Sequence, residues 1–211
     1  MAEPRDKATL QERFGFADKD LESPEHDRWM IWLKNNLKSV IDFLLPQVGI
    51  AGRIGSSFSS VEIVPGAPVE ITFKRSEHPM KNGYFVVGFV DYFASTRMAV
   101  SVTYSRGGRP QRETHTCHWY IEVKTEIPSF GKLMRQLRLY EAFIHNADSE
   151  TQKSVIVVMS TDLRFRDPIE QEGIIFFNPK EMIDGPEDEG EIDGDAELDR
   201  LLMECEDDSK G

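Results

Sequence analysis

The pattern of hydrophobic and polar positions predicts a helix, a strand-rich middle, a second helix and two further strands. Apolar residues recur at helical spacing from Trp29 to Leu44. Ser23 and Pro24 are typical of a helix start, and Pro46 marks where the helix must have ended. Runs of β-branched and aromatic residues with short connections then predict an antiparallel meander. Its strands are expected at 61–64, 69–75, 84–93, 97–104 and 115–124.

The second half continues this order. Residues 132–143 have helical spacing, and residues 154–160 (SVIVVMS) are apolar on both faces. Such a run suits a strand inside a sheet, reached by a helical crossover from the strand before it. Residues 174–177 (IIFF) are expected to form a last short strand. The chain is therefore predicted to be an α/β protein with a mixed central sheet flanked by helices.

Composition changes this picture at the two ends of the chain. Residues 1–22 are polar and expected to be a flexible segment, which leaves one domain over 23–178. Residues 179–211 hold fourteen Asp and Glu against three Lys and Arg, a net charge of −11 out of −12 for the whole chain. This tail should be disordered. Within it, residues 196–206 have amphipathic spacing suited to a protein partner or to the domain itself.

The remaining composition excludes some classes of protein. Without its tail the chain carries a charge of about −1, so the acidic average does not exclude a nucleic-acid partner. Two cysteines are too few for a disulfide framework, and no apolar run is long enough for a membrane helix. We therefore expect a cytoplasmic protein with no membrane partner. His115, Cys117 and His118 alternate across a strand and do not predict a zinc site.

Candidate chemistry is concentrated on two strands and the helix that follows them. Asp91 lies in an apolar strand, where an ionised acid needs a partner. Glu122 and Lys124 share one side of a later strand because strand side chains alternate. Asp91 and Glu122 could bind Mg²⁺, and Lys124 could orient or help deprotonate a water beside a phosphate. Gln136 and Tyr140 lie one turn apart on the following helix.

This order of residues resembles the PD-(D/E)xK nuclease superfamily, and Gln136-x-x-x-Tyr140 is similar to the motif of its RecB-type exonuclease subgroup. The resemblance covers about residues 23–178 and implies an αβββαβ-type, restriction-endonuclease-like core. It implies that Asp91, Glu122 and the Val123 backbone carbonyl bind Mg²⁺, for which Mn²⁺ would substitute. It also implies that Lys124 assists the attacking water, and that Gln136 and Tyr140 contact DNA.

The chain departs from the family pattern in two ways. Val90 stands where the proline of the motif would be, and 31 positions separate Asp91 from Glu122, which implies an extended hairpin. Acids elsewhere contribute to the site in some members, which makes Glu25 and Glu77 further candidate ligands.

Two arginines in a predicted hairpin tip, Arg106 and Arg109, are candidates to bind the DNA backbone. A solvated loop is the equally weighted alternative for them. Each motif residue also has an ordinary alternative: a solvated strand face for Glu122 and Lys124, a turn-capping acid for Asp91, a solvated helix face for Gln136, and a core aromatic for Tyr140.

The combined order favours a metal-dependent nuclease that hydrolyses phosphodiester bonds in DNA. The alternative is a non-catalytic module of the same fold that binds nucleic acid or a protein partner, with the acidic tail as a docking or autoinhibitory element. The sequence leaves open the oligomeric state, strandedness of the substrate, DNA against RNA, and endo- against exonucleolytic cleavage.

Overall fold

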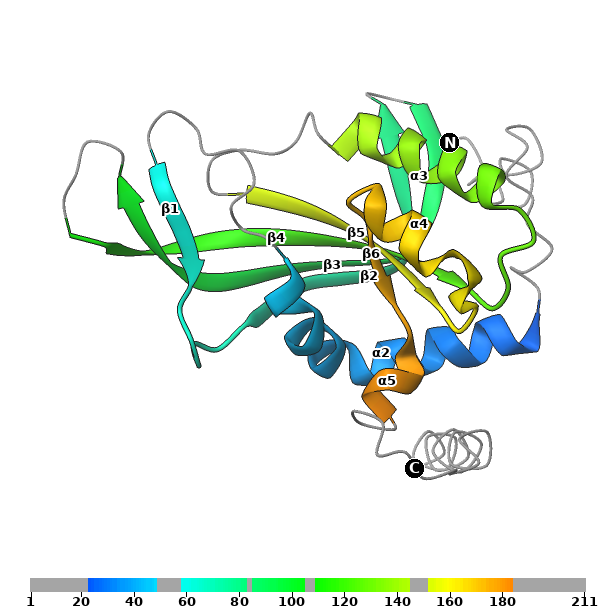
Figure 1. The fold of residues 1–211 in the computed structure, drawn as a ribbon, viewed down its shortest axis with the longest axis horizontal. Helices are drawn as coiled ribbons and strands as arrows, with labels where there is room; N and C mark the ends of the chain where they lie inside the picture. Colours follow the sequence, from blue (N-terminus) through cyan, green and yellow to red (C-terminus); the bar gives the residue numbers. More distant parts are fainter. Residues whose placement is uncertain (1–22, 49–57, 83–84, 105–108, 145–151, 184–211) are drawn as a thin grey trace, which may run out of the picture.

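The computed structural model of the chain describes residues 23–48, 58–82, 85–104, 109–144 and 152–183 (Figure 1). The predicted flexible segment 1–22, Arg106 and the amphipathic stretch 196–206 lie outside these residues. No described helix is long and apolar enough to cross a membrane.

The first helix forms where its end signals predict it. Helix α2 spans Pro24–Leu44, and its cap Ser23 accepts a hydrogen bond from the backbone N–H of His26 at 3.1 Å. A short 3₁₀ helix, η2 (Leu45–Gln47), includes Pro46 and ends the segment. The buried stripe of α2 includes Trp29, Leu33 and Leu37, and it packs against one face of the sheet.

The sheet is mixed in direction, as predicted, and the described residues form six strands of it. Strands β1, β2 and β4 pair antiparallel with β3, whereas β4, β5 and β6 are parallel neighbours. Helix α3 (Phe130–Ile144) provides the predicted crossover between β4 and β5. The strands are β1 (Phe58–Ile63), β2 (Glu70–Asn82), β3 (Phe85–Tyr104), β4 (Gln111–Lys124), β5 (Gln152–Ser160) and β6 (Ile175–Phe177).

The order within the meander differs from the prediction. The two strands expected at 84–93 and 97–104 are one strand, β3, because residues 94–96 are Ala-Ser-Thr and carry no turn-forming Gly, Pro or Asn. A strand of 20 residues is long enough for β1 and β2 to pair along different parts of the same edge. Strand β2 also extends past the predicted end at 75, and its Pro79 is tolerated on an edge strand.

Two hydrophobic clusters lie on opposite faces of the sheet. Trp119, Ile121 and Val123 of β4 belong to the cluster under α2, whereas Tyr120 belongs to the cluster under α3. A 3₁₀ turn, η3 (Leu163–Phe165), and α4 (Arg166–Gln171) follow β5, and Phe165 and Ile169 join the cluster under α3. The central strands are thus buried on both sides by helices.

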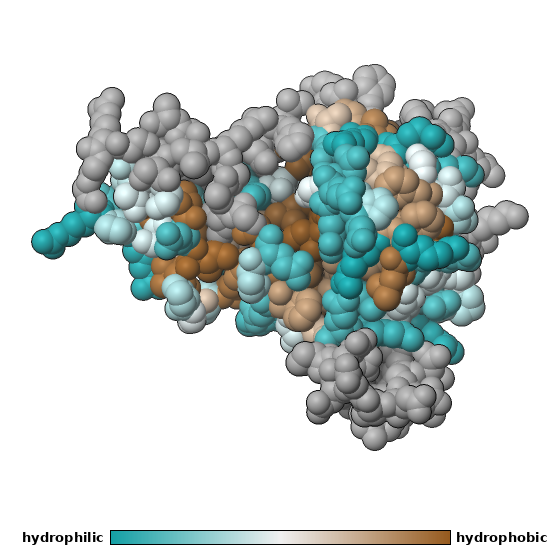
Figure 2. Space-filling view, in the orientation of Figure 1, coloured by the Kyte–Doolittle hydropathy of each residue, from teal (hydrophilic) through white to brown (hydrophobic). Residues whose placement is uncertain are grey.

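Two regions lie outside this sandwich. Helix α5 (Pro179–Ile183) carries the described chain past residue 178, and its Met182 and Ile183 pack against the cluster under α2. At the left of Figure 1, no described helix lies in front of β1 and the neighbouring ends of β3 and β4. Hydrophobic residues are visible on the surface there in Figure 2.

Candidate functional site

The candidate site lies where β3 and β4 stop pairing. The last paired residues are Tyr92 of β3 and Ile121 of β4. Asp91 and Glu122 are the next residues beyond this pair on the two neighbouring strands, and Lys124 is the last residue of β4. The exposed fractions of Asp91, Glu122 and Lys124 are 3%, 2% and 4%. Ionised groups are costly at such depth unless they are paired, so these three side chains must compensate one another or bind a further partner.

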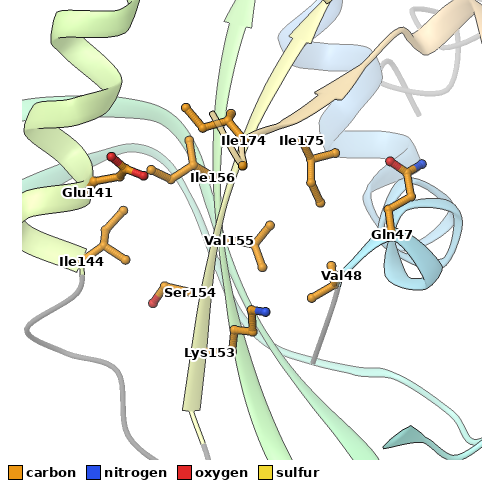
Figure 3. A pocket seen from close by; sticks show the side chains of 11 residues that line it. Gln47, Val48, Glu141, Ile144, Lys153, Ser154, Val155, Ile156, Ile174 and Ile175 are labelled. Atoms are coloured by element: carbon orange, nitrogen blue, oxygen red, sulfur yellow. The ribbon is translucent and has the colours of Figure 1, made fainter. Parts of the chain in front are cut away.

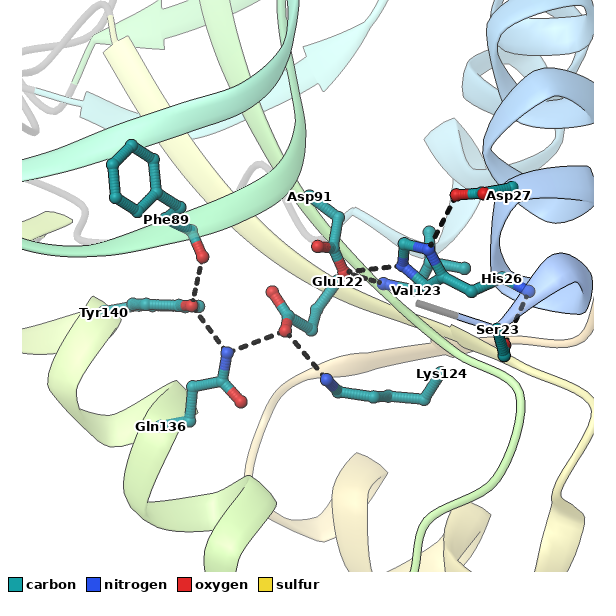
Figure 4. Close-up of polar contacts among 10 residues, drawn as sticks. All are labelled: Ser23, His26, Asp27, Phe89, Asp91, Glu122, Val123, Lys124, Gln136 and Tyr140. Atoms are coloured by element: carbon teal, nitrogen blue, oxygen red, sulfur yellow. Dashed lines mark hydrogen bonds and ion pairs between the residues drawn. The ribbon is translucent and has the colours of Figure 1, made fainter. Parts of the chain in front are cut away.

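Asp91 is held by its own sheet and by α2 (Figure 4). Its Oδ2 accepts a hydrogen bond from the Val123 backbone N–H at 2.9 Å and lies 3.6 Å from Nε2 of His26. Burial alone would raise the pKa of Asp91, but the contact with His26 and the charge of Lys124 outweigh it and lower that pKa. Burial likewise opposes the charge on His26, and Asp91 overcomes it and raises the His26 pKa. The two groups therefore favour a charged pair.

Glu122 has one satisfied and one unsatisfied oxygen. Its Oε1 accepts a hydrogen bond from Gln136 Nε2 at 2.7 Å and lies 3.2 Å from Lys124 Nζ. Its Oε2 is buried and has no hydrogen-bond partner among the residues that the structure describes. Burial and the negative charge of Asp91 raise the pKa of Glu122 to about 7. A buried carboxylate oxygen without a partner is rare, so its presence calls for an explanation.

A hydrogen-bond chain joins Glu122 to β3 through α3. The Gln136 amide also donates to the Tyr140 hydroxyl at 2.6 Å, and that hydroxyl donates to the Phe89 carbonyl at 2.6 Å. Burial, followed by the charge of Glu122, raises the Tyr140 pKa well above its ordinary value, which keeps the hydroxyl a donor. The i, i+4 spacing of the two residues thus positions one carboxylate of the site.

The structure distinguishes the proposed roles of several motif residues from the ordinary alternatives for the same residues. Glu122 and Lys124 are not on a solvated strand face, and Asp91 bonds across to β4 rather than capping a turn. Gln136 is half-buried and bound to Glu122, so it is not a solvated helical residue. Tyr140 does lie in the hydrophobic core, with 2% of its surface exposed, in addition to its polar contacts.

Other predicted residues are not in this cluster. Glu25 is exposed, and its neighbour His26 faces Asp91 instead. Arg109 is exposed before β4, 13 positions from Glu122 and so roughly 40 Å away along the strand. Val123 contacts Asp91 through its backbone N–H. The predicted role of its backbone carbonyl as a metal ligand stays a prediction.

Sequence reasoning missed His26. The signal was available, because His26 precedes Trp29 by three positions and therefore continues the buried stripe of α2. A histidine in that register, near the helix start, had to be either packed or paired. The structure shows that it is 5% exposed and paired with Asp91.

A cavity of about 390 Å³ lies beside Asp91, between α2 and β2. Glu77, an exposed residue of β2, lines it and occupies the position opposite Asp91, between the pairs Ser76–Tyr92 and His78–Val90. Its φ of 51° is in the left-handed region, which a residue other than glycine rarely adopts. Such local strain often occurs at functional sites.

A second cavity of about 150 Å³ shares no residue with this cluster (Figure 3). It lies between the end of α3 and strands β5 and β6, and Ile144, Val155 and Ile174 are among its lining residues. Polar and apolar side chains both line this cavity, and among the described residues Glu141 is its single carboxylate. The candidate chemistry therefore lies on the Asp91 side.

The donor set fits a divalent cation of the Mg²⁺ type. Within the described part of the chain, no three His, Cys, Asp or Glu side chains are grouped so as to hold a metal by themselves. Mg²⁺ does not require such a cage, because one or two carboxylates with waters and substrate oxygens suffice. Asp91 and Glu122 are two buried carboxylates beside Lys124 and His26, and among the described residues Glu122 Oε2 has no hydrogen-bond partner. A cation would satisfy that oxygen.

Comparisons with family models, with curated proteins and with solved structures found no match for this chain. The fold and the site alone define its class: a mixed α/β protein with a buried acid–lysine cluster at the point where two central strands separate.

Proposed function

We propose that the chain is a metal-dependent phosphodiesterase that cleaves DNA, built on a restriction-endonuclease-like core. The observation that supports this most strongly is the convergence of Asp91, Glu122 and Lys124 from two strands into one buried cluster, with Glu122 fixed by Gln136 and Tyr140 of α3. Those residues are the ones that the resemblance to PD-(D/E)xK nucleases picks out. The helix–sheet–helix order around them is similar to that core.

Asp91 and Glu122 would hold Mg²⁺ or Mn²⁺, with the Val123 carbonyl as a proposed third oxygen ligand. His26 Nε2, 3.6 Å from Asp91, is a nearby nitrogen that could join them once metal binding displaces its proton. A bound divalent ion supplies Lewis-acid activation of a phosphoryl oxygen and lowers the pKa of a coordinated water.

The protein's own residues do the remaining work. Lys124 keeps an ammonium next to Glu122, where it can orient the attacking water and offset negative charge that develops on the phosphate. Gln136 and Tyr140 hold Glu122 in place, since a displacement of about 1 Å can cost about a hundredfold in rate. Burial removes competing water and strengthens each of these interactions.

The test is cleavage of DNA in Mg²⁺ and Mn²⁺ by the parent chain, by Lys124→Met and by Lys74→Met, a control on an exposed position of β2. We expect Lys124→Met to lose cleavage while it still binds Mn²⁺ by calorimetry, because the carboxylates remain. Lys74→Met should cut like the parent. Cleavage by Lys124→Met at the parent's rate would refute the role of the lysine.

If the parent neither cuts DNA nor binds Mn²⁺, the non-catalytic alternative is favoured.

A further inference from the structure

Access to Asp91 is through a narrow cavity rather than across an open surface. The cavity of about 390 Å³ is near the lower end of small-ligand pockets, which span roughly 300–1,000 Å³. Asp91 belongs to its lining but is itself 3% exposed, so its carboxylate lies at the inner end. Among the cavities that the described residues form, this is the one that Asp91 lines, and we take it as the route of a phosphate to Asp91.

The cavity wall formed by α2 changes character along its length. Asp27, Met30, Ile31 and Lys34 recur at helical spacing and line the same side. Ile31 is a large apolar side chain that is 46% exposed, and together with the half-buried Met30 it forms the apolar part of this wall. Lys34 lies two turns beyond His26, about 12 Å along the helix axis. The wall thus offers an apolar surface followed by a positive charge.

We infer that this cavity binds a nucleotide of a single nucleic-acid strand, with its base against Met30 and Ile31 and a neighbouring phosphate at Lys34. This inference rests on the proposed function and specifies its substrate as single-stranded. Proteins that bind single strands combine apolar or aromatic surface for bases with positive charge for the backbone. A base can enter a cavity only when it is unpaired, which is why enzymes that bind a base in a pocket act on single strands or on displaced nucleotides.

Carboxylates on both sides of the cavity disfavour a duplex. Asp27 and Glu77 are exposed carboxylates on α2 and β2, on either side of the cavity that leads to Asp91. A duplex presents a second phosphate backbone to this surface, and like charges placed together weaken association. A single strand can pass between the two acids and place its phosphates at Lys34 and Asp91.

The experiment compares one sequence as a labelled single strand and as a blunt duplex, with the full chain in Mn²⁺. Cleavage rates are measured together with binding by fluorescence anisotropy over a range of salt. Lys34→Gln is the test variant, and Lys38→Gln is its matched control one turn along α2, outside the cavity lining. Both lysines are exposed, so neither change should disturb folding.

We expect the single strand to be cut at least about tenfold faster than the duplex, because unpairing opposes entry of a duplex strand. Loss of one phosphate contact should lower the salt slope of single-strand binding by about 0.7 in Lys34→Gln. The Lys34→Gln substitution should also raise KM and leave kcat little changed. Lys38→Gln should match the parent in slope and KM.

Equal cleavage of the duplex, or a salt slope for Lys34→Gln equal to that for Lys38→Gln, would overturn the inference and leave the proposed function standing. If the parent cuts neither substrate, the proposed function fails and binding decides the inference. If single-strand binding is then weaker in Lys34→Gln than in the parent, the inference that the cavity binds a single strand stands. If the two bind equally, the inference is rejected.

Discussion

Two buried histidines lie beside carboxylates at opposite ends of the long β3–β4 ladder. His26 Nε2 is 3.6 Å from Asp91 Oδ2, and His115 Nε2 is 3.6 Å from Glu113 Oε2. The surroundings of the two pairs differ. The Glu113 side chain is 24% exposed and bonded to the Tyr104 hydroxyl, whereas Asp91 is buried next to Glu122 and Lys124.

This difference shows that a histidine–carboxylate pair alone does not identify a site. At the Glu113 end, water and one hydroxyl can satisfy a single carboxylate. At the Asp91 end, two carboxylates, the Lys124 ammonium and His26 are removed from water together, and among the described residues one carboxylate oxygen has no hydrogen-bond partner. Such a concentration of buried ionisable groups is costly to a fold and is therefore a stronger functional signal than a single histidine–carboxylate pair.

The largest expected difference in the rate of DNA cleavage is between Asp91→Asn and Glu113→Gln. Asparagine keeps the size of Asp91 and an acceptor for the Val123 N–H but removes the charge that would hold a cation. DNA cleavage should fall about a thousandfold, equal to about 4 kcal/mol of barrier. Glu113→Gln should retain parental activity. Equal activity of the two variants would place the reaction elsewhere.

The second contrast concerns the dependence of stability on pH in metal-free buffer. The Glu122 pKa is about 7 in the folded chain against an ordinary 4.5, so the folded state retains a proton that the unfolded state loses between these values. The contribution of Glu122 to the free energy of unfolding should therefore be highest below pH 4.5 and should fall as the pH rises to about 7. The loss is on the order of 3 kcal/mol.

Glu122→Gln should remove the fall between pH 4.5 and 6.5. A further loss above pH 6.5 should remain, because the raised His26 pKa also makes stability decline as pH rises. Urea denaturation at several pH values measures both effects. A parent chain whose stability is flat from pH 5 to 8 would show that Glu122 is not desolvated as described.

The smallest contrast uses the two histidines themselves. His26→Gln should weaken Mn²⁺ binding about tenfold, because removal of a group that contacts a metal-binding carboxylate typically costs 10- to 100-fold. His115→Gln and Glu25→Gln should leave Mn²⁺ binding unchanged, since neither residue contacts Asp91 or Glu122. Calorimetric titration of the three variants checks this, and a loss in His115→Gln equal to that in His26→Gln would contradict it.

Sequence patterns were sufficient where a local signal exists. Ser23, Pro24 and Pro46 fix the ends of α2, and the period of two along β4 places Glu122 and Lys124 together. They were insufficient where distant segments meet. The pairing of His26 with Asp91 joins residues 65 positions apart, and it depends on how α2 packs across the sheet.

The continuity of β3 was missed for a related reason. Residues 94–96 carry no strong signal for either a turn or a strand, so pairing with β2 and β4 decides their conformation. Arg109 was predicted to bind the DNA backbone from a hairpin tip, but its distance from Glu122 could not be read from the sequence. A β4 of 14 residues instead puts that end of the strand far from Glu122.

The hydrogen bond from the Val123 amide to Asp91 gives the site a natural spectroscopic reporter. Because the strand ladder has already ended at Tyr92 and Ile121, this amide is bonded to a side chain whose charge the proposed ion would share. In a ¹H–¹⁵N NMR spectrum, the Val123 resonance should therefore respond to a cation at Asp91 directly. The backbone resonances of paired neighbours such as Ile121 should move less, so occupancy of the site becomes readable on the ¹⁵N-labelled chain without a fluorophore or a substrate.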